Sequence, residues 1–202
     1  MDTAADSRNN AAITIVPTGA ALAADVVGVD LSQPLPPGVY AQIRKAWNDH
    51  LVLRFRGQQL DDPAFLNFAR LFGELDAAPI HAGKDVVNPF PEITVMSNIK
   101  VNGKSIGNLG HYEAVWHSDM SYNEKCPIGS LLYAIEVPPV GGNTGFSNMY
   151  LAYDTLPVDL KREVMGKTCR HDSSRNSAGE LDRKSTRLNS SHIPLSRMPS
   201  SA

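Results

Sequence analysis

The sequence has little cysteine, no long apolar run and no strong excess of either charge, and each shortage excludes a class of protein. Its 202 residues include two cysteines, Cys126 and Cys169, which excludes a disulfide-rich secreted scaffold and indicates reduced thiols on small buried or half-buried side chains. No apolar run approaches the roughly 20 residues that cross a bilayer, and no basic-then-apolar leader opens the chain. We therefore expect a cytoplasmic protein without a membrane partner.

The charge is nearly balanced but unevenly distributed. The formal net charge is −2. Residues 182–202 hold four basic residues and one acidic residue, a net charge of +3, so the other 181 residues carry −5. A basic footprint for nucleic acid is therefore absent from the body of the chain. We expect small-molecule chemistry and no nucleic-acid partner; a homo-oligomer is compatible with this sequence, which does not determine the oligomeric state.

The chain has the composition of an ordinary globular protein, with 42% hydrophobic and 20% charged residues. Residues 1–12 are expected to be disordered. Apolar periodicity and capping residues predict helices over 38–50, 61–73 and 157–165. Short β-branched runs between Gly and Pro turns predict strands at 13–16, 25–29, 51–55, 93–96, 130–137, 144–147 and 168–171. This pattern indicates a mainly β fold with flanking α-helices, of the sandwich or jelly-roll type.

Residues 182–202 differ in character from the rest. They have almost no large apolar side chains, a cluster of serines and no strand pattern. Residues 182–185 back-translate to the start of a common sequencing-library adapter, and residues 196–202 resemble a later part of it in a shifted frame. We interpret this stretch as adapter read-through, a non-native tail; the alternative is a natural Ser-rich tail.

The tetrapeptide at 116–119 contains His117 and Asp119 two positions apart. On a strand, side chains at i and i+2 point to the same face, so an imidazole and a carboxylate can reach one cation. They would supply two ligands of a 2-His-1-carboxylate triad for Fe(II). The pair alone is a weak signal, because a surface histidine beside a solvated aspartate is common.

The residues around this pair carry a more specific signal. The segments concerned are AVWHSDMSY at 114–122, LYAIEVPP at 132–139, GGNT at 141–144, FARLFGEL at 68–75, NMYLAY at 148–153 and RHDSSR at 170–175. Together and in this order they closely resemble the taurine/2,4-D dioxygenase family of Fe(II)- and 2-oxoglutarate-dependent enzymes. The resemblance runs from about residue 13 to residue 181.

This resemblance implies a double-stranded β-helix, or jelly roll, of which residues 13–181 form a part that is incomplete at the C-terminus. It implies that His117 and Asp119 are iron ligands and catalytic, and that Thr144 hydrogen-bonds 2-oxoglutarate. Asn143 stands where the family has aspartate. The implied reaction uses O2 to hydroxylate a small organic substrate and releases succinate and CO2; halogenating relatives replace the carboxylate that Asp119 retains here.

The family's third ligand is a distal histidine, followed by an arginine that binds 2-oxoglutarate, and neither is found in this chain. His192 and Arg197 are too close to the first two ligands in sequence and lie in the presumed adapter. We therefore expect the chain to be inactive alone.

The substrate is not expected to be taurine. Taurine-specific relatives resemble one another in a histidine and an asparagine at the positions of Ala78 and Glu113, and an acidic side chain would repel a sulfonate. Candidate pocket residues flank the segments that lead to the iron site; they are His81, Asn98, His111 and Tyr112.

Two other interpretations stay open. One is a non-catalytic jelly-roll module that binds a ligand. The other is a zinc hydrolase that uses the same histidine and aspartate, against which the lack of an HExxH motif weighs. A distal histidine followed within about one strand by an arginine would favour the oxygenase.

Overall fold

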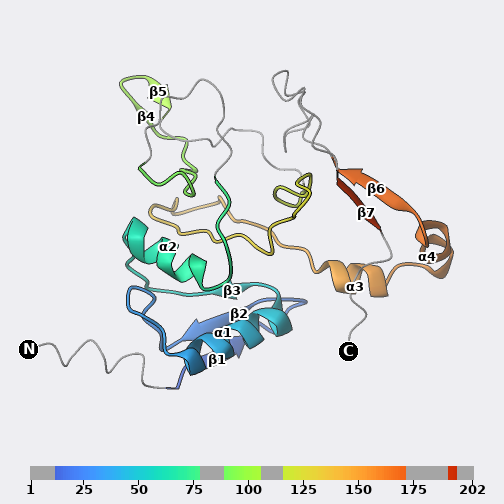
Figure 1. The fold of residues 1–202 in the computed structure, drawn as a ribbon, viewed down its shortest axis with the longest axis horizontal. Helices are drawn as coiled ribbons and strands as arrows, with labels where there is room; N and C mark the ends of the chain where they lie inside the picture. The colour runs from blue at the N-terminus through green and yellow to red at the C-terminus, as the bar shows by residue number, and fades with distance from the viewer. Residues whose placement is uncertain (1–11, 78–88, 106–115, 172–190, 195–202) are drawn as a thin grey trace, which may run out of the picture. The chain divides into compact units, whose positions relative to one another are not determined.

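The computed structural model describes residues 12–77, 89–105, 116–171 and 191–194 (Figure 1). The chain divides into two compact units. The first unit comprises Met1–Leu75 and Tyr133–Leu156, and the second comprises Asp76–Leu132 and Pro157–Ala202. Each unit is described by itself below.

A three-stranded mixed sheet forms the base of the first unit. It contains β1 (Thr14–Pro17), β2 (Ala24–Val27) and β3 (Leu53–Arg54), in the order β1-β2-β3. β1 and β2 are antiparallel, and β2 and β3 are parallel. The three predicted strands in this region are confirmed, although the third is shorter than expected.

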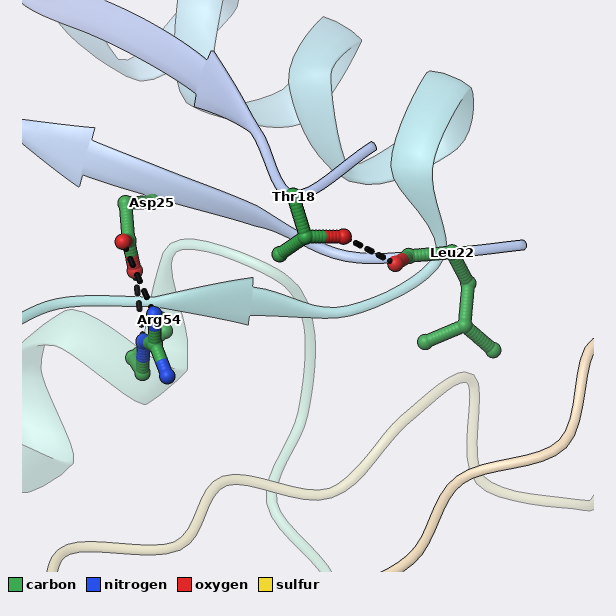
Figure 2. A network of polar contacts seen from close by, with 4 residues as sticks. All are labelled: Thr18, Leu22, Asp25 and Arg54. Atoms are coloured by element: carbon green, nitrogen blue, oxygen red, sulfur yellow. Dashed lines mark hydrogen bonds and ion pairs between the residues drawn. The ribbon is translucent and has the colours of Figure 1, made fainter. Parts of the chain in front are cut away.

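Polar contacts hold the ends and the edge of this sheet together (Figure 2). In the β1–β2 connection, the Thr18 hydroxyl donates a hydrogen bond to the Leu22 carbonyl at 2.8 Å. Asp25 and Arg54 are direct neighbours across β2 and β3. The Arg54 Nε atom lies 2.5 Å from Asp25 Oδ1, and its Nη2 atom lies 2.9 Å from Oδ2.

Two helices cover this sheet, and both follow from local sequence signals. α1 (Pro37–His50) has proline in its first turn and packs on β2 and β3. α2 (Asp62–Arg70) begins after Asp61, whose carboxylate accepts a hydrogen bond from the Ala64 amide at 2.8 Å. The two predicted helices are therefore confirmed, and the residue that caps α2 is Asp61.

The core of the first unit lies between the sheet and these helices. Ile43 is fully buried at the centre of α1. Around it, aromatic rings meet edge to face, with Phe68 and Phe72 at 5.3 Å and Trp47 and Phe72 at 5.4 Å between ring centroids. The buried members of the cluster are Ile13, Val26, Val29, Leu31, Val39, Ile43 and Phe68.

Residues 133–156 join the first unit through long-range hydrogen bonds. The Tyr133 hydroxyl accepts a hydrogen bond from the Leu60 amide at 3.1 Å. Asn148 donates to the Ala21 carbonyl at 2.6 Å and caps α3 (Met149–Asp154), which was not predicted. These contacts bring the GGNT turn into the same unit as the N-terminal sheet.

The second unit contains two short antiparallel pairs and a helix. β4 (Lys100–Val101) and β5 (Lys104–Ser105) form a hairpin that was not predicted. Its turn residues, Asn102 and Gly103, have φ values of 51° and 76°; an Asn-Gly pair favours this backbone. α4 (Val158–Val164) and β6 (Thr168–His171) confirm the predicted helix and strand.

β7 (Ser191–Pro194) pairs with β6 in the register Arg170↔His192. The expectation that residues 182–202 contain no strand is therefore wrong at these four positions. This stretch can form an edge pair because main-chain hydrogen bonds do not require apolar residues.

Three predicted strands are wrong: residues 93–96, 130–137 and 144–147 form no strand. A β-branched run becomes a strand only when another segment pairs with its main-chain groups, and the pattern of a run does not reveal its partner. Several apolar side chains there remain exposed, including Ile135 at 89% and Val137 at 71%. The thiols of Cys126 and Cys169 are free, and both residues are exposed rather than buried.

Of the predicted fold, a mixed sheet with flanking helices is shown. The described residues contain a small mixed sheet with flanking helices and two separate two-stranded pairs. Within the described part of the chain, no helix is both long and apolar enough to cross a membrane.

Candidate metal centre

His117 and Asp119 bring their side chains to one point. The His117 Nε2 atom lies 3.1 Å from the Asp119 Oδ1 atom. The two residues do not lie on a strand, as had been expected: residues 116–118 have no regular secondary structure and Asp119 begins a turn. The side chains still face the same way. Both are accessible, with 46% and 57% of the side chain exposed.

This separation fits two adjacent ligands of one metal ion. Two ligand atoms at about 2.1 Å from a metal, and at a right angle to each other, are roughly 3.0 Å apart. Imidazole nitrogen and carboxylate oxygen are also the donor types of a facial triad. Among the described residues, no group of three or more His, Cys, Asp or Glu side chains gathers as a metal site. The pair therefore offers two donor groups of the types that such a centre uses.

A hydroxyl group holds the second oxygen of the carboxylate. The Ser130 Oγ atom donates a hydrogen bond to Asp119 Oδ2 at 3.0 Å. The two carboxylate oxygens thus have different neighbours, because Oδ1 faces His117 and Oδ2 faces Ser130. Sequence reasoning missed Ser130, which it treated only as the first residue of a strand; a contact across eleven positions leaves no periodic signal.

The turn after Asp119 is held by a second contact. The Nδ1 atom of His171, on β6, lies 2.9 Å from the Ser121 hydroxyl. Met120, between Asp119 and Ser121, has a φ of 46°, which is uncommon for a residue with a side chain. The backbone therefore reverses immediately after the carboxylate, and β6 holds the reversed segment.

The other predicted site residues fall in different parts of the chain. Thr144 is exposed and belongs to the first unit, whereas His117 and Asp119 belong to the second. Asn98 is exposed in the second unit. His81, His111 and Tyr112 lie outside the described residues, as do Ala78 and Glu113, on which the substrate expectation depends.

A small cavity of about 120 Å³ lies in the first unit, away from these residues in sequence. It is lined by the end of β2 and by Arg56 and Gln58. Typical small-molecule sites have volumes of roughly 300–1,000 Å³, so this cavity is too small to be a substrate pocket by itself. The Gln58 amide instead links loops, since it accepts from the Leu31 amide at 2.8 Å and donates to the Val29 carbonyl at 3.0 Å.

Comparison with known families shows which family the chain belongs to. Residues 14–199 match the family model described as "Taurine catabolism dioxygenase TauD, TfdA family". The chain belongs to this family. The TauD/TfdA match contains the His117–Asp119 pair, Ser130 and Thr144.

Relatives within the TauD/TfdA family agree with the assignment. The chain is 35% identical over 150 residues to an alpha-ketoglutarate-dependent 2,4-dichlorophenoxyacetate dioxygenase of Burkholderia sp. (strain RASC), covering 70% of this chain and 50% of the relative. It is 38% identical over 165 residues to the pentalenolactone F synthase of Streptomyces avermitilis, covering 79% and 52%. The chain thus spans about half the length of the curated relatives it matches.

Solved TauD/TfdA structures resemble it as well. The crystal structure of a taurine dioxygenase from Burkholderia xenovorans superposes with a TM-score of 0.65 at 30% identity, over 80% of this chain and 55% of that chain. The described elements therefore belong to a known dioxygenase scaffold.

Proposed function

We propose that this chain is the part of an Fe(II)- and 2-oxoglutarate-dependent dioxygenase that carries two of its iron ligands. The observation that carries the proposal is the 3.1 Å separation of His117 Nε2 and Asp119 Oδ1. Family membership supports the same chemistry, since relatives are named for alpha-ketoglutarate-dependent reactions. The enzyme would work in the cytoplasm on a small organic substrate with O2, and its core would be a jelly roll completed by further sequence.

Each of the proposed site residues would have a separate role. His117 and Asp119 would hold the iron through one nitrogen and one oxygen, with Ser130 bonded to the other carboxylate oxygen. Thr144 would donate a hydrogen bond to 2-oxoglutarate. When bound, Fe(II) with 2-oxoglutarate supplies the oxidising chemistry that hydroxylates a C–H bond and releases succinate and CO2. The protein contributes orientation and exclusion of side reactions.

The chain alone would be inactive. A facial triad needs a third protein ligand, and the described residues bring together only two candidate ligands. We propose that the third histidine and the arginine for 2-oxoglutarate come from the half of the family sequence that this chain does not match.

The substrate would be a small organic molecule other than taurine. The relatives' names include 2,4-dichlorophenoxyacetate and (S)-phenoxypropionate as substrates of those proteins. A carboxylic acid of aryloxyalkanoate type is therefore the first class to test. Ala78 and Glu113 stand where taurine-specific relatives resemble one another in a histidine and an asparagine, so the two polar groups expected to bind a sulfonate are missing.

The proposal is tested with the complete protein. Its gene is recovered from the source nucleotides, and the protein is expressed with its own sequence in place of residues 182–202. The purified protein is incubated with Fe(II), 2-oxoglutarate and O2 together with a panel of aryloxyalkanoates and taurine, and succinate is measured. We expect succinate release that depends on an aryloxyalkanoate and is lost in His117→Ala. A full-length protein that binds Fe(II) but never forms succinate would refute it.

A second candidate function is a non-catalytic jelly-roll module that binds a ligand. The accessibility of His117 and Asp119, and the absence of a third metal-binding side chain beside them among the described residues, favour it. The same experiment separates the two functions. A module would bind an organic acid without consuming 2-oxoglutarate, and its binding would not require the His117 imidazole.

A further inference from the structure

The carboxylate of Asp119 is held from two sides by groups of different chemistry. Its Oδ1 atom lies 3.1 Å from the His117 imidazole, and its Oδ2 atom accepts a hydrogen bond of 3.0 Å from the Ser130 hydroxyl. We propose that Ser130 is a positioning residue that makes Asp119 a one-oxygen metal ligand, with Oδ1 turned toward His117. This inference rests on the proposed function and concerns the same site.

Without a partner, the carboxylate has considerable rotational freedom. The terminal torsion of aspartate is broad and roughly two-fold, so either oxygen can face a metal and both can bind at once. A donor on Oδ2 removes this freedom, because rotation would break the hydrogen bond. Outer-shell partners of this kind orient metal ligands in many centres. Ser130 supplies such a donor here, and it contacts the carboxylate rather than the metal.

The loop between Asp119 and Ser130 folds back on itself through internal contacts, which bring the serine hydroxyl close to the carboxylate. The Asn123 amide donates to the Met120 carbonyl at 3.0 Å. Farther along, the Cys126 thiol lies 3.5 Å from the Ser121 carbonyl oxygen and 3.5 Å from that of Asn123. The loop is thus closed by its own hydrogen bonds before it reaches Ser130. The position of the serine is therefore set by the loop, and the serine in turn sets the carboxylate.

The charge pattern also favours this role. A serine hydroxyl donates a hydrogen bond without adding charge, so it orients the carboxylate without competing with a cation for it. A lysine or arginine in the same place would form an ion pair with Asp119 and weaken metal binding. Ser130 is exposed, so its replacement should not disturb a packed core.

The test measures Mn(II) binding to the 202-residue chain. The ion is titrated into the protein, and the electron paramagnetic resonance signal of free Mn(II) reports how much remains unbound. The variants are Ser130→Ala, which removes the hydroxyl, and Ser130→Thr, which keeps it. The matched control is Ser147→Ala, at another exposed serine. Circular dichroism melting of each variant reports on folding.

We expect Ser130→Ala to weaken Mn(II) binding by about 10-fold or more, the usual cost of losing an outer-shell partner. Ser130→Thr and Ser147→Ala should bind as the unaltered chain does. The inference is overturned if Ser130→Ala binds Mn(II) like the unaltered chain. It is also overturned if Ser130→Thr binds Mn(II) as weakly as Ser130→Ala while both variants melt normally. A third contrary outcome is an equal loss of Mn(II) affinity in Ser130→Ala and Ser147→Ala.

Failure of the proposed function gives a different result. In that case the unaltered chain and His117→Ala show the same Mn(II) titration, which would refute both the metal site and the role of Ser130. If His117→Ala loses binding and Ser130→Ala does not, only the role of Ser130 is refuted. If Ser130→Ala melts at a lower temperature than the unaltered chain, Ser130→Thr decides whether the hydroxyl positions Asp119. A folded threonine variant with full Mn(II) affinity supports that role.

Discussion

The imidazole of His117 and the carboxylate of Asp119 meet at 3.1 Å even though their backbone is not a strand. Residues 116–118 have no regular secondary structure, a turn begins at Asp119, and Met120 then takes a backbone conformation with positive φ. The two side chains therefore converge for a local reason, and their convergence does not depend on how the two units are placed. Metal binding by the pair can be tested in this chain alone.

The first prediction concerns the two ligands. His117→Ala and Asp119→Asn should each abolish Mn(II) binding, so that the resonance spectrum becomes that of the free ion. Each change removes one of two donors, which costs more than the roughly 10–100-fold expected for an outer-shell partner. His50→Ala, at the end of α1, is the control and should bind normally. Unchanged binding in either ligand variant would show that the metal sits elsewhere.

The second prediction concerns the pH dependence of stability. The hydrogen-bonded Arg54 guanidinium lowers the pKa of Asp25, and the charge of Arg56 acts in the same direction. A carboxyl group whose folded pKa lies below its unfolded value of about 3.9 stabilises the fold above that pH. This contribution is lost as the pH falls through the folded pKa.

Urea unfolding at about pH 6 and about pH 3 measures this effect, because the two values lie on either side of the unfolded pKa. Asp25→Asn removes the titrating group, so its midpoint should fall less between the two pH values than that of the unaltered chain. The loss should be small, since both side chains reach solvent and screening weakens exposed pairs. Equal falls in both proteins would contradict a lowered pKa.

The third prediction concerns the start of α2. Asp61→Ala removes the side chain that accepts from the Ala64 amide and should lower the free energy of unfolding by about 1 kcal/mol. Asp61→Asn is the matched variant; it retains an oxygen acceptor, and asparagine caps helices about as well as aspartate. The urea midpoint at neutral pH is the measurement. A loss of equal size in both variants would mean that charge, and not capping, stabilises this helix end.

The fourth prediction concerns residues 182–202. We expect a chain that ends after residue 181 to unfold at the same urea midpoint as the full chain. The β6–β7 pair in this region has four residues in each strand, and an isolated two-stranded pair is marginally stable in water. A clear drop in the midpoint on deletion would show that β7 belongs to the native fold and would argue against adapter read-through.

Local signals predicted most of the N-terminal part of the first unit. Helix spacing located α1, and an aspartate followed by proline located the start of α2. The hairpin at β4 and β5 was missed although its Asn-Gly turn is a strong signal. The failures at 93–96, 130–137 and 144–147 have one cause: each run has strand composition, but pairing requires a partner that composition does not name.

The sequence by itself determined α1, α2 and α4, the two-residue spacing of His117 and Asp119, and membership of the TauD/TfdA family. All of these depend on neighbours within a few positions or on motifs in a set order. Only the tertiary structure decided that Ser130 bonds to Asp119, that His171 holds Ser121 and that Tyr133 meets Leu60. These contacts join residues 11, 50 and 73 positions apart, and a loop of that length leaves no periodic pattern in the chain from which its closure could be inferred.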